Sequence, residues 1–418
     1  MAKHFVKDLS LAKVGEQEIA WAQSQMPALI KVKERFAKQK PFKGISIGAC
    51  LHVTKETAVL VRTLEAGGAQ VHLCASNPLS TQDSVAAALA ASGTPVFAVK
   101  GMSNKEYYES LNNCLAGKPN ITIDDGADLI TEIHSKRTDL LKGIIGGQEE
   151  TTTGVIRLRA MAADGALKYP VIAINDARTK MFFDNRFGTA QSTIDGIMRA
   201  TDVLLAGKTF VVGGFGWCGR GIASRARGMG CNVIVCEVDP VKALEAKMEG
   251  FRVMTMAKAA AEADIIVTAT GDKTVVGVDA FKNAKDGVII GNSGHFNVEI
   301  DIPALEKLST KKEQPRPNIE RFTLADGRKI LLLAQGRLLN LACASGHPSE
   351  VMQMSFANQA LASEYLVKNA GKLENKVYPV PKEIDEQVAQ LALDAMGVKI
   401  DGLSPEQKKY LSSWQEGT

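Results

Sequence analysis

Lys180 and Asp184 stand four residues apart in the stretch of residues 175–190, which also contains Asn175, Asp176 and Asn185. On a helix this spacing is typical of an ordinary ion pair on the surface. The stretch lies, however, between two regions that each predict a sheet, so a lysine beside a carboxylate could also act as a base in proton transfer. The spacing alone leaves both interpretations open.

Polar residues follow five of the strands expected in the first half of the chain. In an open α/β sheet, ligands bind in the crevice outside the carboxyl ends of the strands, so these residues should converge on one site. Each alone could simply be the N-cap of the next helix, but five in one sheet favour a site. In chain order they are His52 with Thr54 and Glu56, then Asn77, then Asp124 and Asp125, then Glu149 to Thr153, and last Asn175 with Asp176.

A glycine-rich pattern, G-x-G-x-x-G, directly follows the apolar run of residues 209–213. Its glycines would make a tight turn, let the backbone approach a pyrophosphate and let the next helix pack on the strand. A second apolar run ends at Glu237, where a carboxylate would bind the ribose hydroxyls and favour NAD over NADP. The pattern predicts a dinucleotide site and comprises Gly214, Phe215, Gly216, Trp217, Cys218 and Gly219.

Two later strands of this second region end in small polar residues, in segments 268–271 and 292–295, which suit the lining of a dinucleotide groove. His295 could be a buried structural histidine, but its place above the groove favours a functional role. Residues 346–349, Gly-His-Pro-Ser, form a joint where the chain could return to the first sheet. Together with residues 175–190, this joint predicts a hinge with two crossings.

Strands and helices must position these residues, and apolar runs alternate with helical segments along most of the chain. A helix is expected over residues 14–40, and a capping box at residues 103–106 predicts another helix start. The alternation predicts the α/β class, with two doubly wound parallel-sheet domains, one for the substrate and one Rossmann domain for NAD, plus a small helical C-terminal tail. The expected strands span residues 44–49, 70–74, 95–99, 120–123, 143–147 and 169–174, then 209–213, 232–236, 252–254, 264–268 and 287–291.

Domain boundaries follow from this pattern. We expect a substrate-binding domain over residues 1–180 and 347–375, an NAD-binding domain over residues 188–340, and a C-terminal oligomerisation tail over residues 376–418. The prolines of residues 378–381 suit an extended linker. The two amphipathic segments after them would need another surface, so a contact between subunits is expected.

Composition narrows the class of partner. The 418 residues contain 50 Lys and Arg against 46 Asp and Glu, which argues against a nucleic acid or a membrane surface and favours a small molecule. The seven cysteines form no C-x-x-C pair, so neither a disulfide framework nor a zinc site is expected, and no metal is predicted. The N-terminus lacks the apolar region of a signal peptide, and no stretch is apolar for long enough to span a membrane, so a cytoplasmic protein is expected.

Taken together, these blocks resemble the S-adenosylhomocysteine hydrolase family over nearly the whole chain. The family hydrolyses S-adenosyl-L-homocysteine reversibly to adenosine and L-homocysteine, holds one tightly bound NAD in each subunit, and usually forms tetramers. A thioether at the ribose 5′ carbon leaves poorly in direct hydrolysis, so the family oxidises the 3′ carbon, eliminates homocysteine, adds water and reduces the 3′ carbon again. The matching blocks are residues 50–58, 77–83, 124–126, 149–154, 180–185, the glycine-rich pattern, 294–296 and 346–349.

The resemblance implies roles for the candidate catalytic residues. Lys180 would take the proton of the 3′ hydroxyl, with its pKa depressed by burial beside the nicotinamide, and Asp184 would set its charge and geometry. His52 and Asp125 would transfer the C4′ proton and assist the leaving group or the water. Glu150 would hold the ribose hydroxyls. The catalytic set also includes the residues beside the nicotinamide and ribose, Asn185 and His295.

The resemblance likewise implies which residues bind each ligand. Adenosine would contact Thr54, Glu56, Asp125, Glu150, Lys180, Asp184 and His347. Besides the glycine-rich pattern, NAD would contact Thr151, Thr152, Thr153, Asn185, Glu237, Lys242, Thr270, Ser293, Gly294, His295, Asn340 and His347.

Three positions depart from the family's pattern. Thr189 stands where many members carry a cysteine near the nicotinamide, so redox tuning by that thiol is expected to be absent. Lys242 stands where an asparagine often contacts the NAD ribose. The chain ends Trp-Gln-Glu-Gly-Thr, without the Lys-and-Tyr tail through which longer members reach a neighbour's NAD. These departures bear on cofactor affinity and exchange.

Other functions fit the same scaffold. A hydrolase of S-inosylhomocysteine would need a different contact to the base, and Glu56 favours adenine, whose amino group can donate to a carboxylate. A catalytically silent NAD-binding regulator should have lost its proton-transfer residues, which this chain keeps. A 2-hydroxyacid dehydrogenase is disfavoured because its arginine and histidine substrate pair is not apparent.

Overall fold

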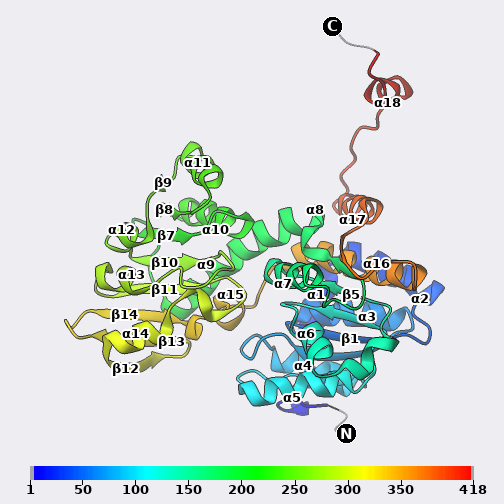
Figure 1. The fold of residues 1–418 in the computed structure, drawn as a ribbon, viewed down its shortest axis with the longest axis horizontal. Helices are drawn as coiled ribbons and strands as arrows, with labels where there is room; N and C mark the ends of the chain where they lie inside the picture. Colours follow the sequence, from blue (N-terminus) through cyan, green and yellow to red (C-terminus); the bar gives the residue numbers. More distant parts are fainter. Residues whose placement is uncertain (1–3, 416–418) are drawn as a thin grey trace.

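The computed structural model describes residues 4–415, which fold into two lobes, each built around one sheet (Figure 1). The sheet of the first lobe has seven parallel strands in the order β15-β6-β5-β4-β1-β2-β3. Parallel strands need crossover helices, which cover both faces of the sheet and leave the strands largely buried. The six strands expected here are present with ends displaced by a few residues: β1 (Ser46–Leu51), β2 (Gln70–Ala75), β3 (Val96–Phe97), β4 (Ile121–Asp124), β5 (Gly146–Glu149) and β6 (Val171–Ala173).

Helices from both ends of the chain cover this sheet. Residues 14–40 are helical as expected, apart from a break at residues 25–26 that divides them into two helices, α1 (Ala12–Ser24) and α2 (Pro27–Gln39). Pro27 opens α2, and a proline is tolerated in the first turn of a helix but not in its interior. The capping box at Ser103 is confirmed. The other helices of this lobe are α3 (Lys55–Ala66), α4 (Asp83–Ala91), α5 (Asn104–Leu115), α6 (Asp128–Ser135), α7 (Thr152–Ala163), α16 (Ser349–Lys368) and α17 (Lys382–Ala395), with 3-10 turns at Leu9–Leu11, Thr138–Gly143 and Ile174–Asp176.

The second lobe contains an eight-stranded sheet in the order β12-β13-β14-β11-β10-β7-β8-β9. The strands from β14 to β9 are parallel, as expected for a Rossmann domain, whereas β13 runs antiparallel to β12 and β14. This antiparallel edge was not expected, because β12 reads STKKEQPR and shows no apolar alternation. The strands are β7 (Thr209–Gly213), β8 (Asn232–Cys236), β9 (Arg252–Val253), β10 (Ile265–Thr268), β11 (Val288–Asn292), β12 (Ser309–Arg316), β13 (Ile319–Leu324) and β14 (Lys329–Leu333).

The helices of the second lobe pack on both faces of its sheet, which separates two buried apolar clusters. The helix α10 begins directly after the glycine-rich turn, as expected for a strand-turn-helix unit. The helices are α10 (Trp217–Gly228), α11 (Pro240–Met248), α12 (Met256–Ala260), α13 (Val278–Asn283), α14 (Ile302–Leu308) and α15 (Leu339–Ala342), with 3-10 turns at Asn297–Glu299 and Ala334–Gly336.

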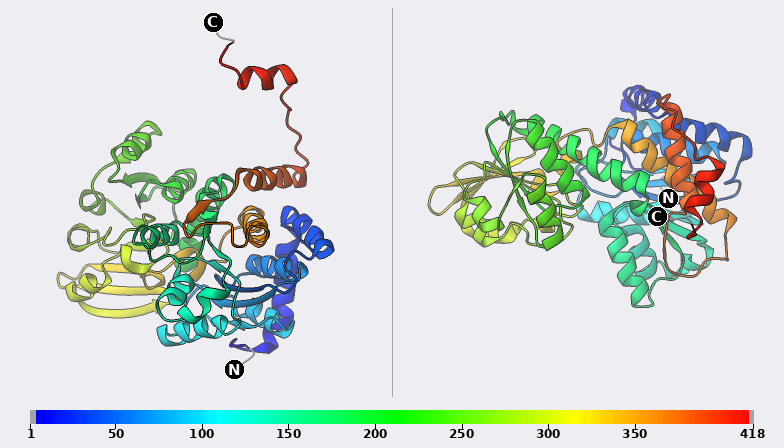
Figure 2. Two further views of the ribbon diagram at one scale, coloured as in Figure 1. Left: turned by 45° about the vertical axis from the view of Figure 1, so that its right-hand side comes forward. Right: turned by 90° about the horizontal axis from the view of Figure 1, so that it is seen from above.

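The chain crosses between the lobes twice. The first crossing is a continuous helical rod made of α8 (Arg178–Lys180), a π-helix (Met181–Gly188) and α9 (Thr189–Thr201), drawn in green between the lobes in Figure 2. The second crossing runs from α15 to the long helix α16, which packs against α2 and α3 of the first lobe. Both crossings lie where the sequence predicts the hinge.

The C-terminal region differs from the expected linker. Residues Val377–Pro379 form β15, an edge strand parallel to β6, so this segment belongs to the first sheet. Pro379 is tolerated there because one side of an edge strand makes no ladder hydrogen bonds. Helix α17 packs on α16 and α2, whereas α18 (Pro405–Leu411) stands away from both lobes (Figures 1 and 2). Within residues 4–415, no helix is long and apolar enough to cross a membrane.

Candidate active site

A cavity lies at the carboxyl ends of β1, β4 and β5 and is lined by residues of both lobes. Its mixture of polar and apolar lining residues suits a small molecule. Four apolar residues, Leu338, Leu341, Met352 and Phe356, line part of it and were not predicted. The predicted residues that line it are His52, Thr54, Glu56, Asp125, Glu150, Thr151, Thr152, Lys180, Asp184, Asn185, Thr189, Cys218, Ser293, His295, Asn340 and His347.

Lys180 enters this cavity at the start of the π-helix. A π-helix pairs residues five apart, and the Lys180 Nζ donates to Asn185 Oδ1 at 2.6 Å, while Asp184 Oδ2 lies 3.6 Å from the same nitrogen. Both Lys180 and Asp184 are buried, at 4% and 3% exposure. The interpretation of this pair as a surface ion pair is therefore wrong, because the rod is enclosed by both lobes at this point.

The charges of this pair stabilise each other. Burial lowers the pKa of Lys180, but the carboxylates of Asp184 and Glu150 outweigh burial and leave the pKa above its ordinary value. Burial raises the pKa of Asp184, but Lys180 and His347 outweigh it and bring the pKa well below its ordinary value. The depressed pKa expected for Lys180 is thus not a property of the protein side chains alone. A positive charge placed nearby, such as a nicotinamide ring, would act in the lowering direction.

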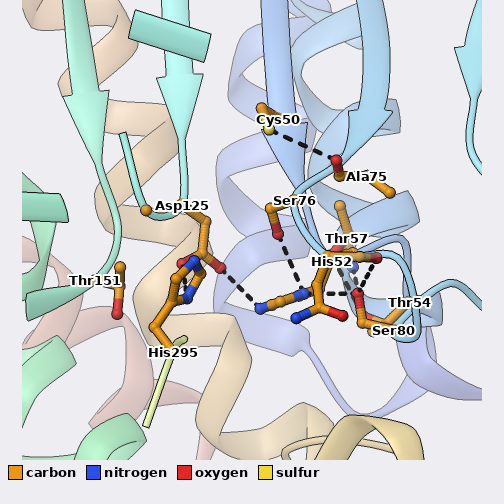
Figure 3. Close-up of polar contacts among 12 residues, drawn as sticks. Cys50, His52, Thr54, Thr57, Ala75, Ser76, Ser80, Asp125, Thr151 and His295 are labelled. Atoms are coloured by element: carbon orange, nitrogen blue, oxygen red, sulfur yellow. Dashed lines mark hydrogen bonds and ion pairs between the residues drawn. The ribbon is translucent and has the colours of Figure 1, made fainter. Parts of the chain in front are cut away.

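His52, Asp125 and His295 form a second group, in which the lobes meet (Figure 3). His52 Nε2 lies 3.3 Å from Asp125 Oδ2, and His295 Nδ1 lies 3.5 Å from Asp125 Oδ1. On its other side, His52 Nδ1 contacts the hydroxyls of Ser80 at 2.8 Å and Ser76 at 3.1 Å. Burial lowers the pKa of His52 to about 4, so the ring is neutral near pH 7. A neutral ring can then donate from Nε2 to the carboxylate and accept from serine at Nδ1.

The same three side chains offer ligand atoms within 4.8 Å of one another. This spacing could hold a divalent metal ion, although the sequence predicts none.

Four carboxyl groups lie at the carboxyl ends of β4 and β5, and they divide into two kinds. Asp124 and Glu149 are fully buried and accept hydrogen bonds from backbone N–H groups of residues 125, 126, 127, 130 and 151, so they shape the loops. Asp125 and Glu150 line the cavity instead. Burial and the neighbouring Asp125 raise the pKa of Glu150 to about 8, so Glu150 is largely protonated at neutral pH and can donate a hydrogen bond.

His347 lies on the second crossing between the lobes. It contacts Asp184, a predicted substrate residue, and Asn340, a predicted NAD residue. Its Nδ1 lies 2.9 Å from Asp184 Oδ1, and its Nε2 lies 3.2 Å from Asn340 Nδ2 and 3.4 Å from Thr189 Oγ1. The Thr189 hydroxyl also lies 3.7 Å from the sulfur of Cys218. A thiol therefore lies beside this position, supplied by the predicted Cys218 of the glycine-rich turn.

The glycine-rich turn has the shape that a dinucleotide requires. Gly214 takes a φ of 97°, and a Cβ on Gly219 would lie 2.0 Å from the Gly214 carbonyl oxygen, so both positions require glycine. Beside Gly216, which precedes α10, a Cβ would meet open space, and the N-terminus of α10 has no side-chain cap. Glu237 Oε2 accepts from the backbone N–H of Phe215 at 2.7 Å, which fixes the carboxylate beside the turn. These residues fit a pyrophosphate on the helix N-terminus and a ribose at Glu237.

The other predicted cofactor residues lie along the same edge of the second sheet or face it. Thr270 bonds to Glu299, Ser293 bonds to Thr193, and the hydroxyl of Thr153 approaches Gly271 from the first lobe. The residues outside the cavity lining are Thr153, Gly214, Phe215, Gly216, Trp217, Gly219, Glu237, Lys242, Thr270 and Gly294. Lys242 is half-exposed and pairs with Asp239 at 3.4 Å.

Two residues that the sequence placed at the site lie outside it, and the importance of three others was not predicted. Asn77 accepts from Leu79 N–H in a local turn, and Asp176 pairs with Arg159 near the surface. Asn175 is the more important residue, because its Oδ1 accepts from Lys180, Asn185 and Thr152. Two serines of α16 were missed, Ser349, which donates to Glu56, and Ser355, which donates to Asp184.

Two family models match this chain, one in each lobe. The model of the S-adenosyl-L-homocysteine hydrolase family matches residues 3–140, and the model of its NAD binding domain matches residues 185–346. Adenosylhomocysteinase of Aquifex aeolicus is 60% identical over 99% of this chain and 99% of its own length. The chain belongs to the S-adenosylhomocysteine hydrolase family. The family assignment also establishes the NAD-binding domain.

Further relatives extend the family match to archaea. Adenosylhomocysteinase of Saccharolobus solfataricus is 58% identical over 99% of each chain. The S-inosyl-L-homocysteine hydrolase of Methanocaldococcus jannaschii is 55% identical over 99% of each chain. Overall identity therefore does not distinguish the two bases, and the contacts around Glu56 must be considered.

Proposed function

We propose that this protein hydrolyses S-adenosyl-L-homocysteine reversibly to adenosine and L-homocysteine. The observation that carries the proposal is the convergence of two proton-transfer groups on one cavity beside a dinucleotide turn. The first group is Lys180 with Asp184 and Asn185, and the second is His52 with Asp125 and His295. A silent regulator would have no reason to keep both groups buried and mutually oriented.

Bound NAD would supply the reversible oxidation at the 3′ carbon of the ribose. Lys180 would accept the proton of the 3′ hydroxyl, with Asp184 and Asn185 holding its nitrogen in place. Glu150, protonated near pH 7, would donate to a ribose hydroxyl. His52 and Asp125 would move the proton of the 4′ carbon and assist departure of the thiol and entry of water.

The choice of adenine over hypoxanthine follows from Glu56. A carboxylate accepts a hydrogen bond from the exocyclic amino group of adenine, whereas hypoxanthine presents a carbonyl at the same position. Since one relative at 55% identity is an S-inosyl-L-homocysteine hydrolase, S-inosylhomocysteine is the second candidate substrate.

The domain division over residues 1–180 with 347–375, 188–340 and 376–418 stays a prediction, as do the hinge and the cytoplasmic location. The homotetramer is also a proposal, and exposed apolar residues in the C-terminal region support a contact with a second copy. These are Leu403, Tyr410, Leu411 and Trp414, at 51%, 52%, 68% and 91% exposure.

Incubating the purified protein with S-adenosylhomocysteine tests the proposed function. We expect adenosine and homocysteine in equal amounts, and release of NAD when the protein is denatured. A protein that releases NAD but forms neither product would contradict the proposal and favour a binding role. Production of inosine and homocysteine from S-inosylhomocysteine alone would favour the second candidate.

A further inference from the structure

The carboxylate of Glu56 is held on one side only. Glu56 lies in the first turn of α3, is 1% exposed and lines the cavity. Its Oε1 lies 2.8 Å from the Lys55 Nζ and accepts from the Ser349 hydroxyl at 2.7 Å. Among residues 4–415, no hydrogen bond to Oε2 is present. One oxygen is therefore used by the protein, and the other is left for a ligand.

The two donors come from different parts of the chain and are themselves positioned. The backbone N–H of Lys55 donates to the Gln82 side chain at 2.9 Å, and the Gln82 amide nitrogen reaches the carbonyl of Ser345 on the returning crossing at 3.2 Å. Ser349 is the first residue of α16 and is 6% exposed. The Lys55 side chain is 19% exposed, so it is mostly buried beside Glu56. Glu56 is thus fixed by a local neighbour and by the second crossing together.

A carboxylate held in this way can only accept a hydrogen bond at its free oxygen. The ammonium of Lys55, 2.8 Å from Oε1, offsets part of the cost of burying the negative charge. A purine with an exocyclic amino group can donate a hydrogen bond to the free oxygen of Glu56. A purine with a carbonyl at that position would place its own acceptor oxygen against the carboxylate oxygen. A site built to receive a hydrogen bond rejects an analogue that cannot give it.

We propose that Lys55 and Ser349 are positioning residues that determine base specificity, by keeping Glu56 as an acceptor for a 6-amino purine. The proposal rests on the proposed function, since the base is read only when the nucleoside occupies the cavity. It assigns the discrimination between adenosine and inosine to two residues that need not touch the base.

The test measures kcat and KM for the condensation of homocysteine with adenosine and, separately, with inosine. The variants are Lys55→Met, Ser349→Ala and Ser349→Thr, and Lys31→Met, on the exposed face of α2, is the matched control. We expect the natural chain to prefer adenosine. Lys55→Met should lower the ratio of kcat/KM for adenosine to that for inosine about tenfold, mainly through a higher KM for adenosine. Ser349→Ala should lower it about threefold, and Ser349→Thr, which keeps the hydroxyl, should restore it.

Each outcome decides between the proposals. If Lys55→Met and Ser349→Ala leave the ratio unchanged while both nucleosides still react, the specificity role is wrong and the proposed function stands. If both variants slow adenosine and inosine equally, the residues are structural only. If the natural chain prefers inosine, the inference is overturned and the second candidate substrate is favoured. If the natural chain condenses neither nucleoside, the proposed function itself is wrong. Should Lys55→Met not fold, the Ser349 pair still gives the answer.

Discussion

The two lobes place different chemistry at the same structural position. At the carboxyl ends of the first sheet lie His52, Asp125 and Glu150, which are ionisable and largely buried. At the carboxyl ends of the second sheet lie mainly glycines and hydroxyls, with a backbone turn open at Gly216 and the carboxylate of Glu237 beside it. The first lobe thus presents ionisable groups suited to proton transfer, and the second presents a backbone turn suited to a phosphate.

Because of this difference, we expect substitutions in the first lobe to change the reaction and substitutions in the second lobe to change the affinity for the cofactor. Buried titratable groups perturb one another's pKa values, as Asp125 does for Glu150, so changes in the first lobe should alter protonation and turnover. Backbone N–H groups at a helix N-terminus carry no titratable proton, so changes in the second lobe should alter binding. Substitutions on either side can test that separation.

The largest effect is expected at Lys180, on the rod between the lobes. Lys180→Met removes the proposed base for the 3′ hydroxyl, so turnover should fall about 10³-fold while NAD stays bound. Mixing the variant with adenosine and following the absorbance of reduced nicotinamide checks this, with Lys31→Met as the control. Normal reduction of the bound cofactor would remove Lys180 from the proposed mechanism.

Glu150 should make stability depend on pH. Its pKa rises from 4.5 to about 8 on folding, mainly through burial, so the folded protein binds more protons at this residue between those values. The contribution is complete below about pH 4.5 and is lost as the pH rises towards 8. Glu150→Gln removes this pH-dependent loss. The free energy of unfolding of the variant, relative to that of the natural chain, should therefore rise by about 3 kcal/mol from pH 5 to pH 8.

Urea unfolding at both pH values measures that difference. The matched control is Glu34→Gln, on the exposed face of α2, which should show the same offset at each pH. A Glu150→Gln offset that does not change with pH would show that Glu150 is ionised in the folded protein.

Glu237 should affect the cofactor rather than the proton chemistry. Glu237→Ala removes the acceptor for the ribose hydroxyls and the negative charge that would repel a 2′-phosphate. The preference for NAD over NADP should fall about tenfold, measured as binding of each cofactor to apo-protein. Stronger binding of NADP than NAD to the natural apo-protein would instead contradict the cofactor role of Glu237.

The smallest expected effect is a change in shape. If the lobes open and close about the crossings at residues 175–190 and 340–349, an adenosine analogue should lower the radius of gyration without changing the oligomer. Small-angle scattering measures the radius, and hydrogen exchange reports on both crossings. Identical scattering and exchange with and without the analogue would mean that the site is preformed.

Sequence patterns predicted the parts of the fold that repeat a simple rule. The strand-turn-helix unit at Gly214 and β7 agrees closely, since turn glycines and an apolar strand are local signals. The strand-end residues His52, Asp125 and Glu150 line one cavity because parallel strands end at one edge. In both cases, residues close together in the sequence are enough to predict the local structure.

Other features depend on contacts that sequence spacing does not record. The π-helix that joins Lys180 to Asn185 differs from an α-helix by a wider turn, and no residue type marks it. Ser349 and Ser355 act on residues far away in the chain, so their hydroxyls could not be matched to Glu56 and Asp184. The raised pKa of Lys180 depends on carboxylates brought close by both the rod and β5.

Gly126 leaves room for a histidine of the second lobe. Its φ of 106° is one that residues with side chains rarely adopt, and a Cβ there would lie 2.2 Å from His295 Nε2. A side chain at this position would therefore require the His295 ring to move. Because His295 Nδ1 lies 3.5 Å from Asp125 Oδ1, the missing Cβ at Gly126 lets the ring approach the carboxylate with which the first lobe meets it.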